Sequence, residues 1–191
     1  MIKIGILGDI GSGKSYVAQK FGYPVFNADQ EVAKLYKQNK NVYINLKNTL
    51  PKYIYSFPIE KIEISNAILA NKYNLNKIVK IVHSEIRKKM NIFFIKHKNK
   101  KIVILDIPLL LENKINKKED ILVFVQSKQS DILKRLKKRK NFNQNLLKKF
   151  KNIQYPAEYK KKKSDFIIKN DFTKKTVNDG IKNILKEIEQ Q

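Results

Sequence analysis

The sequence has no cysteine and only two histidines. A chain without thiols cannot form disulfides, a cysteine nucleophile or a cysteine-ligated zinc site, and two histidines alone cannot close a metal site. No apolar run approaches the roughly 20 residues that a membrane-spanning helix needs, and Met1–Ile4 lead into a strand pattern instead of a secretory leader. We therefore expect a soluble, cytoplasmic protein without redox chemistry, zinc or membrane association.

Acidic residues are also scarce, with 17 Asp and Glu against 41 Lys and Arg and a net charge of +24. Such an excess of positive charge is typical of proteins that bind nucleic acids. The excess is nearly all lysine, however, and it accompanies abundant Asn, Ile, Tyr and Phe, as an AT-rich coding sequence would produce for any function. A nucleic-acid-binding role therefore rests on charge alone, and we expect no nucleic-acid partner.

Arginine is rare as well, since the chain has only Arg87, Arg135 and Arg139. The guanidinium group is a planar fork that can bind two phosphate oxygens at once, which the ammonium group of lysine cannot do. The three arginines are thus candidate phosphate-binding residues. The alternative is that they are chance codons on solvated helix faces.

Short apolar segments alternate with helical patterns along the chain. Strands are predicted at residues 2–7, 24–26, 101–106, 121–125 and 166–168. Strands that alternate with helices favour an α/β fold with a parallel sheet covered on both faces. A length of 191 residues suits a single domain, residues 1–191, with mobile additions.

Three regions of this domain differ in pattern. The core is expected at about 1–40, 100–127 and 164–191, and a helical region interrupted by Pro51 and Pro58 at about 41–99. Residues 128–163 hold fourteen Lys or Arg residues against two acids, Asp131 and Glu158. This region is either a solvated pair of helices or a cationic lid over a polyphosphate.

Gly8–Ser15 satisfies the pattern G-x-x-x-x-G-K-[ST] directly after a strand and before a helix. In this context the glycines let successive backbone N–H groups point inward, and the lysine reaches the β and γ phosphates of ATP. The serine hydroxyl is offered to Mg²⁺, and the next amide can meet the α phosphate. The predicted nucleotide-binding residues of this loop are Gly8, Gly11, Ser12, Gly13, Lys14, Ser15 and Tyr16.

Asp9 does not fit the rest of this loop, because a carboxylate near a triphosphate is repulsive. We expect its side chain to face solvent or a cation.

Asp106 follows the four apolar residues Ile102–Leu105, which is the Walker B pattern. A carboxylate at the end of a strand beside the phosphate loop would hold Mg²⁺ directly or through water. The alternative is an ordinary aspartate that caps the next turn.

These motifs and several others occur in one order along nearly the whole chain. They are Gly8–Ser15, Asn27–Asp29, His83–Arg87, Leu105–Glu112, Arg135 with Arg139, Gln154–Pro156 with Lys160, and Asp165–Asn170. Together they resemble the dephospho-CoA kinase family. The phosphate loop alone indicates only a superfamily, whereas the segment Asp-Ile-Pro-Leu-Leu-x-Glu, with His-x-x-Ile-Arg and Gln-x-Pro, narrows the resemblance to this family.

The resemblance implies a P-loop kinase fold of three layers, with a short central parallel sheet, a helical substrate-binding insertion and a helical lid. It implies transfer of the γ-phosphoryl group of ATP to the 3′-hydroxyl of dephospho-CoA, giving coenzyme A and ADP in the last step of coenzyme A biosynthesis. ATP and Mg²⁺ would be the cofactors and dephospho-CoA the small-molecule partner. A monomer is expected, with an oligomer as the alternative.

The resemblance also assigns substrate-binding and catalytic residues. Asp29 is similar to an acid near the acceptor hydroxyl, which it could orient or deprotonate; the alternative is a helix N-cap. His83 and Arg87 stand four residues apart, so on a helix they would share a face and could grip the ribose and phosphates of the substrate. Asp106, Pro108 and Leu109 belong to the same substrate-binding set.

Arg135 and Arg139 repeat that spacing in the lid, where a fork could stabilise the charge of the transferring phosphoryl group. Arg139 joins Lys14 and Asp29 as a predicted catalytic residue. Asn170 resembles a position near the adenine, where an amide can form a hydrogen bond; the alternative is a turn residue.

The chain departs from the family at four positions. The family usually has glycine at Asp9, aspartate at Asn27, proline at Ser84 and an acid at Lys140. Another small-molecule P-loop kinase, of the nucleoside monophosphate or shikimate kinase type, remains the alternative; it would share the loop and the lid but not residues 106–112.

Overall fold

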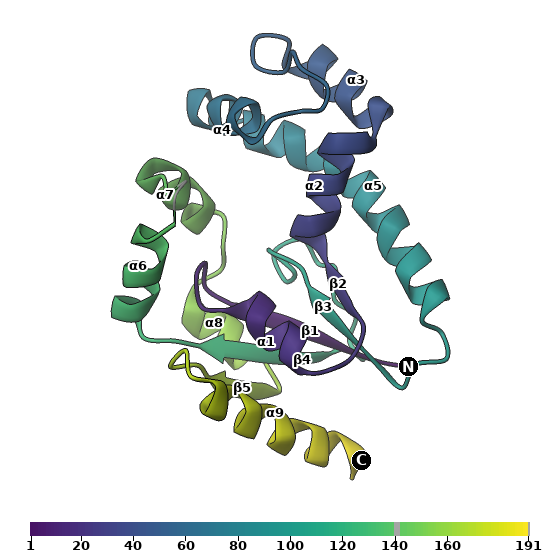
Figure 1. Ribbon diagram of the computed structural model, residues 1–191, viewed down its shortest axis with the longest axis vertical. Coiled ribbons are helices and arrows are strands. Elements are labelled where there is room, and N and C mark those ends of the chain that lie inside the picture. The colour runs from purple at the N-terminus through teal and green to yellow at the C-terminus, as the bar shows by residue number, and fades with distance from the viewer. Residues whose placement is uncertain (140–141, 191) are drawn as a thin grey trace. The chain divides into compact units, whose positions relative to one another are not determined.

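The computed structural model describes residues 1–139 and 142–190, which form an α/β fold around a five-stranded sheet (Figure 1). All strand pairings are parallel, in the order β2-β3-β1-β4-β5. The strands are β1 (Ile2–Gly8), β2 (Val25–Asn27), β3 (Ile102–Asp106), β4 (Ile121–Gln126) and β5 (Phe166–Lys169). Each of the five predicted strands is thus confirmed, and no bound is shifted by more than one residue.

The central strand β1 pairs with β3 on one side and β4 on the other, with Ile2 opposite Ile102 and Gly8 opposite Val125. Because the strands run parallel, their carboxyl ends lie at one edge of the sheet. In open parallel sheets this edge is where ligands bind. The phosphate loop leaves β1 at that edge.

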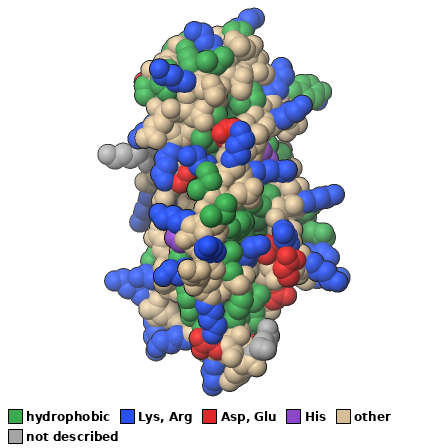
Figure 2. All heavy atoms as spheres, turned by 90° about the vertical axis from the view of Figure 1, so that its right-hand side faces the viewer, with side chains coloured by type: hydrophobic (Ala, Val, Ile, Leu, Met, Phe, Trp, Pro, Cys, Tyr) green, Lys and Arg blue, Asp and Glu red, His purple; other side chains and the backbone are tan. Residues whose placement is uncertain are grey.

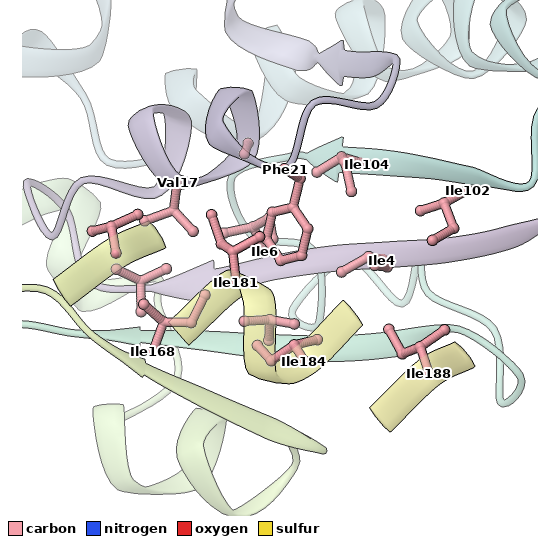
Figure 3. Close-up of a cluster of buried hydrophobic side chains, with 14 residues drawn as sticks. Ile4, Ile6, Val17, Phe21, Ile102, Ile104, Ile168, Ile181, Ile184 and Ile188 are labelled. Carbon is pink, nitrogen blue, oxygen red and sulfur yellow. The ribbon is translucent and has the colours of Figure 1, made fainter. Parts of the chain in front are cut away.

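One face of the sheet is covered by helices α1 (Lys14–Lys20) and α9 (Lys174–Glu189). Figure 3 shows Ile6 of β1 between side chains of both helices, among them Phe21, which ends α1, and Ile181. These side chains are at most 4% exposed. Full burial of such a side chain contributes about 1.5–3 kcal/mol, so this cluster anchors both helices on the strands.

The opposite face is packed more closely. Gly5 alternates with Ile4 and Ile6 along β1 and therefore points away from that cluster. A Cβ atom at Gly5 would lie 2.6 Å from Leu110 and 3.0 Å from Leu122. Helix α8 (Ala157–Lys162) also contacts β1. The sheet is thus the middle of three layers, and the predicted three-layer α/β fold with a central parallel sheet is confirmed.

The described residues divide into two compact units. The first consists of Met1–Asn27, His97–Asn143 and Phe150–Gln191 and contains the whole sheet. The second consists of Ala28–Lys96 and Gln144–Lys149. Helix α2 (Ala28–Gln38) therefore groups with the helical unit, although the sequence pattern placed these residues in the core. The single domain with its insertion and lid remains a prediction.

The second unit is helical, with α2 (Ala28–Gln38), α3 (Lys40–Thr49), α4 (Lys61–Ala70) and α5 (Asn74–Lys96). Pro51 and Pro58 lie between α3 and α4, where the sequence pattern was interrupted. Glu63 is 1% exposed and forms a reciprocal capping box with Glu60 at the start of α4. Lys149 donates from its ammonium group to the carbonyls of Ile68 and Leu69 at the other end of that helix.

The predicted lid region contains α6 (Gln129–Lys137), α7 (Gln144–Asn152) and α8.

Figure 2 shows lysine and arginine side chains scattered over one face of the protein, interspersed with apolar side chains. Among the described residues no helix is both long and apolar enough to cross a membrane.

Candidate active site

The phosphate loop has backbone angles that favour glycine. Gly8, Gly11 and Gly13 have φ values of 145°, 89° and 93°, which side-chain-bearing L residues rarely adopt. Space is limited as well, since a Cβ atom at Gly13 would lie 2.4 Å from the side-chain nitrogen of Asn170. Glycine is therefore required in this loop both because it adopts positive φ values and because it has no side chain.

The ammonium group of Lys14 lies over the start of this loop. It donates to the carbonyl oxygens of Gly8 at 3.0 Å and Asp9 at 2.9 Å. These bonds restrict a side chain that would otherwise lose rotamer freedom on binding a phosphate. The loop thus presents a positioned cation.

Asn170 supports the loop from the end of β5. Its side-chain N–H donates to the carbonyl of Ser12 at 2.8 Å, and its side-chain oxygen accepts from the N–H of Phe172. Ser127, directly after β4, donates to the same Ser12 carbonyl at 3.0 Å. Asn170 is 2% exposed. Its observed role is to hold the loop against the sheet, and the predicted contact with adenine remains a prediction.

Asp9 faces a cation, as predicted. One carboxylate oxygen lies 3.0 Å from the ammonium group of Lys160, and the other accepts from the side chain of Gln129 at 2.9 Å. Lys160 is 3% exposed and also donates to the carbonyl of Gly8 at 3.4 Å. The carboxylate is therefore compensated on both of its oxygens.

Asp106 ends β3 and is 3% exposed. Its Oδ2 accepts a hydrogen bond from the side chain of Asn27, the residue directly opposite on β2. Among the described residues no three His, Cys, Asp or Glu side chains converge to hold a metal ion. A cation at Asp106 would therefore take its remaining ligands from a bound phosphate and water, as Mg²⁺ commonly does.

The other predicted residues of the first unit surround these groups. Ser15 is exposed, and Tyr16 is partly buried on α1. Pro108 and Leu109 follow β3, and Leu109 has a φ of 58°. Leu109 lines a small cavity together with Gly8, Lys14, Ile107, Leu110, Glu112, Gln154, Lys160 and two residues of β1.

The two lid arginines differ in their surroundings. The guanidinium carbon of Arg135 lies 4.2 Å from the centre of the Phe172 ring, a cation–π contact at the end of β5. Arg139 is exposed just after α6, so its predicted contact with a phosphoryl group remains a prediction. Lys140, one of the four departures, lies outside the described residues.

A separate cavity of about 410 Å³ lies where β4 and β5 end. Gln126, Ser127, Lys169 and Asn170 line it, together with Lys128, Asp131, Asp171 and Thr176. Its volume falls in the range of small-molecule sites.

Asp29, His83 and Arg87 belong to the second unit, whereas the other predicted site residues belong to the first. Asp29 is the second residue of α2, where an acid also favours the helix N-terminus. His83 and Arg87 lie on α5, as predicted. Burial lowers the pKa of His83, and the positive charge of Arg87 lowers it further. Both effects favour the neutral form of the His83 imidazole.

No role was predicted from the sequence for Lys160, Gln129 or Glu112. Lys160 begins a run of four lysines, and only its place in the family resemblance with Gln154–Pro156 distinguishes it from the other three. The carboxylate of Glu112 accepts from the backbone N–H of Tyr155, which fixes the segment before α8. A contact between residues 43 positions apart has no local sequence signal.

Comparison with known proteins identifies the family. A sequence model described as dephospho-CoA kinase matches residues 2–176. The chain belongs to the dephospho-CoA kinase family. The predicted family is therefore confirmed, and with it the prediction that this protein is a kinase.

Two relatives illustrate the extent of the similarity. Dephospho-CoA kinase of Wolbachia pipientis wMel is 34% identical over 187 residues, which cover 95% of each chain. That of Bartonella quintana is 33% identical over 173 residues, covering 86% of this chain and 87% of the relative.

Solved structures agree at the level of the fold. A protein from Thermus thermophilus superposes with a TM-score of 0.77 and 25% identity over 98% of this chain and 97% of the other. Dephospho-CoA kinase from Campylobacter jejuni has a TM-score of 0.61 and 21% identity over 97% and 96%.

Proposed function

We propose that this protein transfers the γ-phosphoryl group of ATP to the 3′-hydroxyl group of dephospho-CoA, which yields coenzyme A and ADP. The observation that carries the proposal is a glycine-defined phosphate loop with a positioned lysine, in a chain of the dephospho-CoA kinase family. The small-molecule substrate class follows from that family. The precise acceptor is part of the proposal.

ATP would be held by the loop Gly8–Ser15. Inward-pointing N–H groups bind phosphate oxygens, and the amide of Tyr16, in the first turn of α1, is offered to the α phosphate. The ammonium group of Lys14 is held by two loop carbonyls, so little reorganisation is needed to stabilise charge on the β and γ phosphates. The 410 Å³ cavity beside Asn170 is a suitable volume for the nucleoside part of ATP.

Magnesium is the proposed metal, with Ser15 and Asp106 as its protein ligands. The donor set fits, because one buried carboxylate and one hydroxyl leave most positions to phosphates and water, which is how Mg²⁺ is usually bound at such sites. The bound ion would neutralise charge on the phosphates.

Asp29 would orient the acceptor hydroxyl group or accept its proton. The hydroxyl oxygen forms a bond to the γ phosphorus of ATP, while the bond between that phosphorus and the oxygen of the departing ADP breaks. His83 and Arg87 would bind the ribose and phosphates of dephospho-CoA, with Pro108 and Leu109 beside the acceptor. Arg135 and Arg139 would bind ATP and the transferring phosphoryl group. A neutral His83 can accept or donate one hydrogen bond, and Arg87 supplies the charge.

We expect the reaction to take place in the cytoplasm, with a monomer as the active form and without a nucleic-acid or membrane partner. These points remain predictions from the sequence.

An assay of ADP release with Mg-ATP tests the proposal. Dephospho-CoA is compared with AMP, shikimate and no acceptor, and the product mass is measured. Turnover with dephospho-CoA alone, giving a product heavier by one phosphoryl group, is the expected result. Phosphorylation of another acceptor, or none at all with ATP still bound, would reject the proposed substrate.

Three variants test the residue roles. Lys14→Ala and Asp29→Asn should each lose activity by roughly a hundredfold or more, the scale of lost charge stabilisation or base catalysis. Lys182→Ala, which removes an exposed lysine from α9, is the matched control and should keep full activity. Equal losses in all three proteins would indicate a general effect of substitution.

A further inference from the structure

The Asp9–Lys160 pair links the phosphate loop to helix α8. Asp9 is the one acid within Gly8–Ser15, and Lys160 is separated from it by 151 positions. The ammonium group lies 3.0 Å from the carboxylate although its side chain is only 3% exposed. A long-range ion pair with a buried cation therefore forms at the predicted ATP site.

Each charge in this pair needs the other. An ammonium group removed from water is destabilised unless it is paired and hydrogen-bonded. Lys160 meets that requirement with the Asp9 carboxylate and the Gly8 carbonyl. The carbonyl of Gly8 also accepts from Lys14, so both ammonium groups converge on the same backbone atom.

The carboxylate of Asp9 would oppose a polyphosphate if it were not compensated. Like charges repel most strongly where protein excludes water. Lys160 compensates this charge from α8, and Gln129 donates to the second carboxylate oxygen from the start of α6. The two ends of the 128–163 region thus bind one side chain of the loop.

We propose that Lys160 is a positioning residue for ATP, which acts by neutralising Asp9 and keeping its carboxylate turned away from the bound phosphates. The inference rests on the proposed function, in which the loop binds ATP. Lys160 itself need not contact the nucleotide. In this chain the effect of removing Lys160 on ATP binding should therefore depend on the carboxylate of Asp9.

A double-mutant cycle with Asp9→Asn, Lys160→Met and both together tests this dependence. The dissociation constants of adenosine, ADP and ATP are measured by calorimetry with Mg²⁺. Because dephospho-CoA takes no part, failure of this inference is distinguishable from failure of the proposed acceptor. Lys162→Met, an exposed lysine of the same helix, is the matched control.

Lys160→Met should weaken ATP binding by at least about tenfold, because it leaves an uncompensated carboxylate beside the phosphates. ADP should be affected less and adenosine not at all. Asp9→Asn should bind ATP at least as tightly as the wild type. The double variant should recover to within about threefold of Asp9→Asn, since neutral partners need no compensation.

Two results would overturn the inference. If the double variant binds ATP as weakly as Lys160→Met, then Lys160 acts on the nucleotide directly and not through Asp9. If adenosine binding falls in parallel with ATP binding, the pair is only structural. Should Lys160→Met fail to fold, Lys160→Gln, which can still donate to Gly8, is measured in the same cycle.

Discussion

The side-chain amide of Asn27 donates a 2.5 Å hydrogen bond to Oδ2 of Asp106. The two residues are direct partners in the parallel pairing of β2 with β3. A neutral amide thus lies against a buried carboxylate at the edge of the sheet where the phosphate loop begins.

Asn27→Asp should replace this hydrogen bond by a pair of opposed carboxylates. Like-charge repulsion should destabilise the protein by about 1–3 kcal/mol in the presence of a chelator. A divalent cation between the carboxylates should then restore stability. Thermal unfolding with EDTA and with millimolar Mg²⁺ measures both effects.

Asn27→Ala is the matched control for this change, because it removes the hydrogen bond without adding charge. It should lose stability in both solutions. Recovery of Asn27→Ala by Mg²⁺, or no recovery of Asn27→Asp, would contradict the predicted carboxylate pair.

Gly13→Ala should abolish ATP binding. Its positive φ and the 2.4 Å approach to Asn170 both oppose a methyl group, so strain of about 1–3 kcal/mol is expected together with a displaced loop. Gly22→Ala separates the two causes, since Gly22 has a φ of 75° but open space around it. Gly22→Ala should lower the melting temperature while ATP affinity, measured by calorimetry, stays at the wild-type value. Equal ATP affinities in the two variants would show that neither the positive φ nor the contact with Asn170 makes glycine necessary at position 13.

His83 should make the protein less stable as the pH falls. Burial and Arg87 lower its pKa in the folded state, so below about pH 6.5 the unfolded state binds more protons. Stability should therefore be complete at neutral pH and decline on acidification toward the lowered folded-state pKa. Denaturant unfolding between pH 7.5 and 5.5 measures this slope.

His83→Gln should reduce that slope, while His97→Gln, which leaves His83 in place, should keep it. A slope unchanged in His83→Gln would show that another group is responsible.

Glu63→Gln should destabilise the helical unit. Burial alone would raise the pKa of Glu63, but hydrogen bonds from the Ser56 hydroxyl and from the N–H groups of Tyr55, Glu60 and Ser56 outweigh it and lower the pKa. In the glutamine variant, the side-chain NH2 group would face N–H or O–H groups that now donate to a carboxylate oxygen. The lost hydrogen bonds should lower the free energy of unfolding by about 2–3 kcal/mol. Urea unfolding of Glu63→Gln beside Glu119→Gln, an exposed control, measures the difference. Equal stability of the two variants would mean that the capping contacts contribute little.

The strands and the phosphate loop could be predicted because their signals are local. Ile102–Leu105 is a continuous apolar run, as a strand buried on both faces requires. The glycines of the phosphate loop, which have positive φ values, all lie within the eight residues Gly8–Ser15. The surroundings of the loop could not be predicted in this way. The family resemblance singles out Lys160 from a run of similar lysines, but its partner Asp9, 151 positions away, is visible only in the folded chain.

Asn170 illustrates a different difficulty. The sequence placed it after the last strand, which is correct, and the family resemblance suggested a position near the adenine, with a turn residue as the alternative; the adenine contact remains a prediction. The structure uses that amide to hold the Ser12 carbonyl. Side-chain amides have several donors and acceptors, so the position of such a residue indicates its neighbourhood but not its partner.

Because β1 is the central strand of the sheet and carries the phosphate loop, ATP binding should affect how fast the protein is degraded. Local opening usually begins at edges, and β2 and β5 are the edge strands here. Fraying of either leaves β1 hydrogen-bonded to both of its neighbours, with the loop still attached. A molecule that retains ATP is therefore one whose central strands are closed, and bound nucleotide should lengthen the lifetime of the chain against proteases that cut only opened molecules.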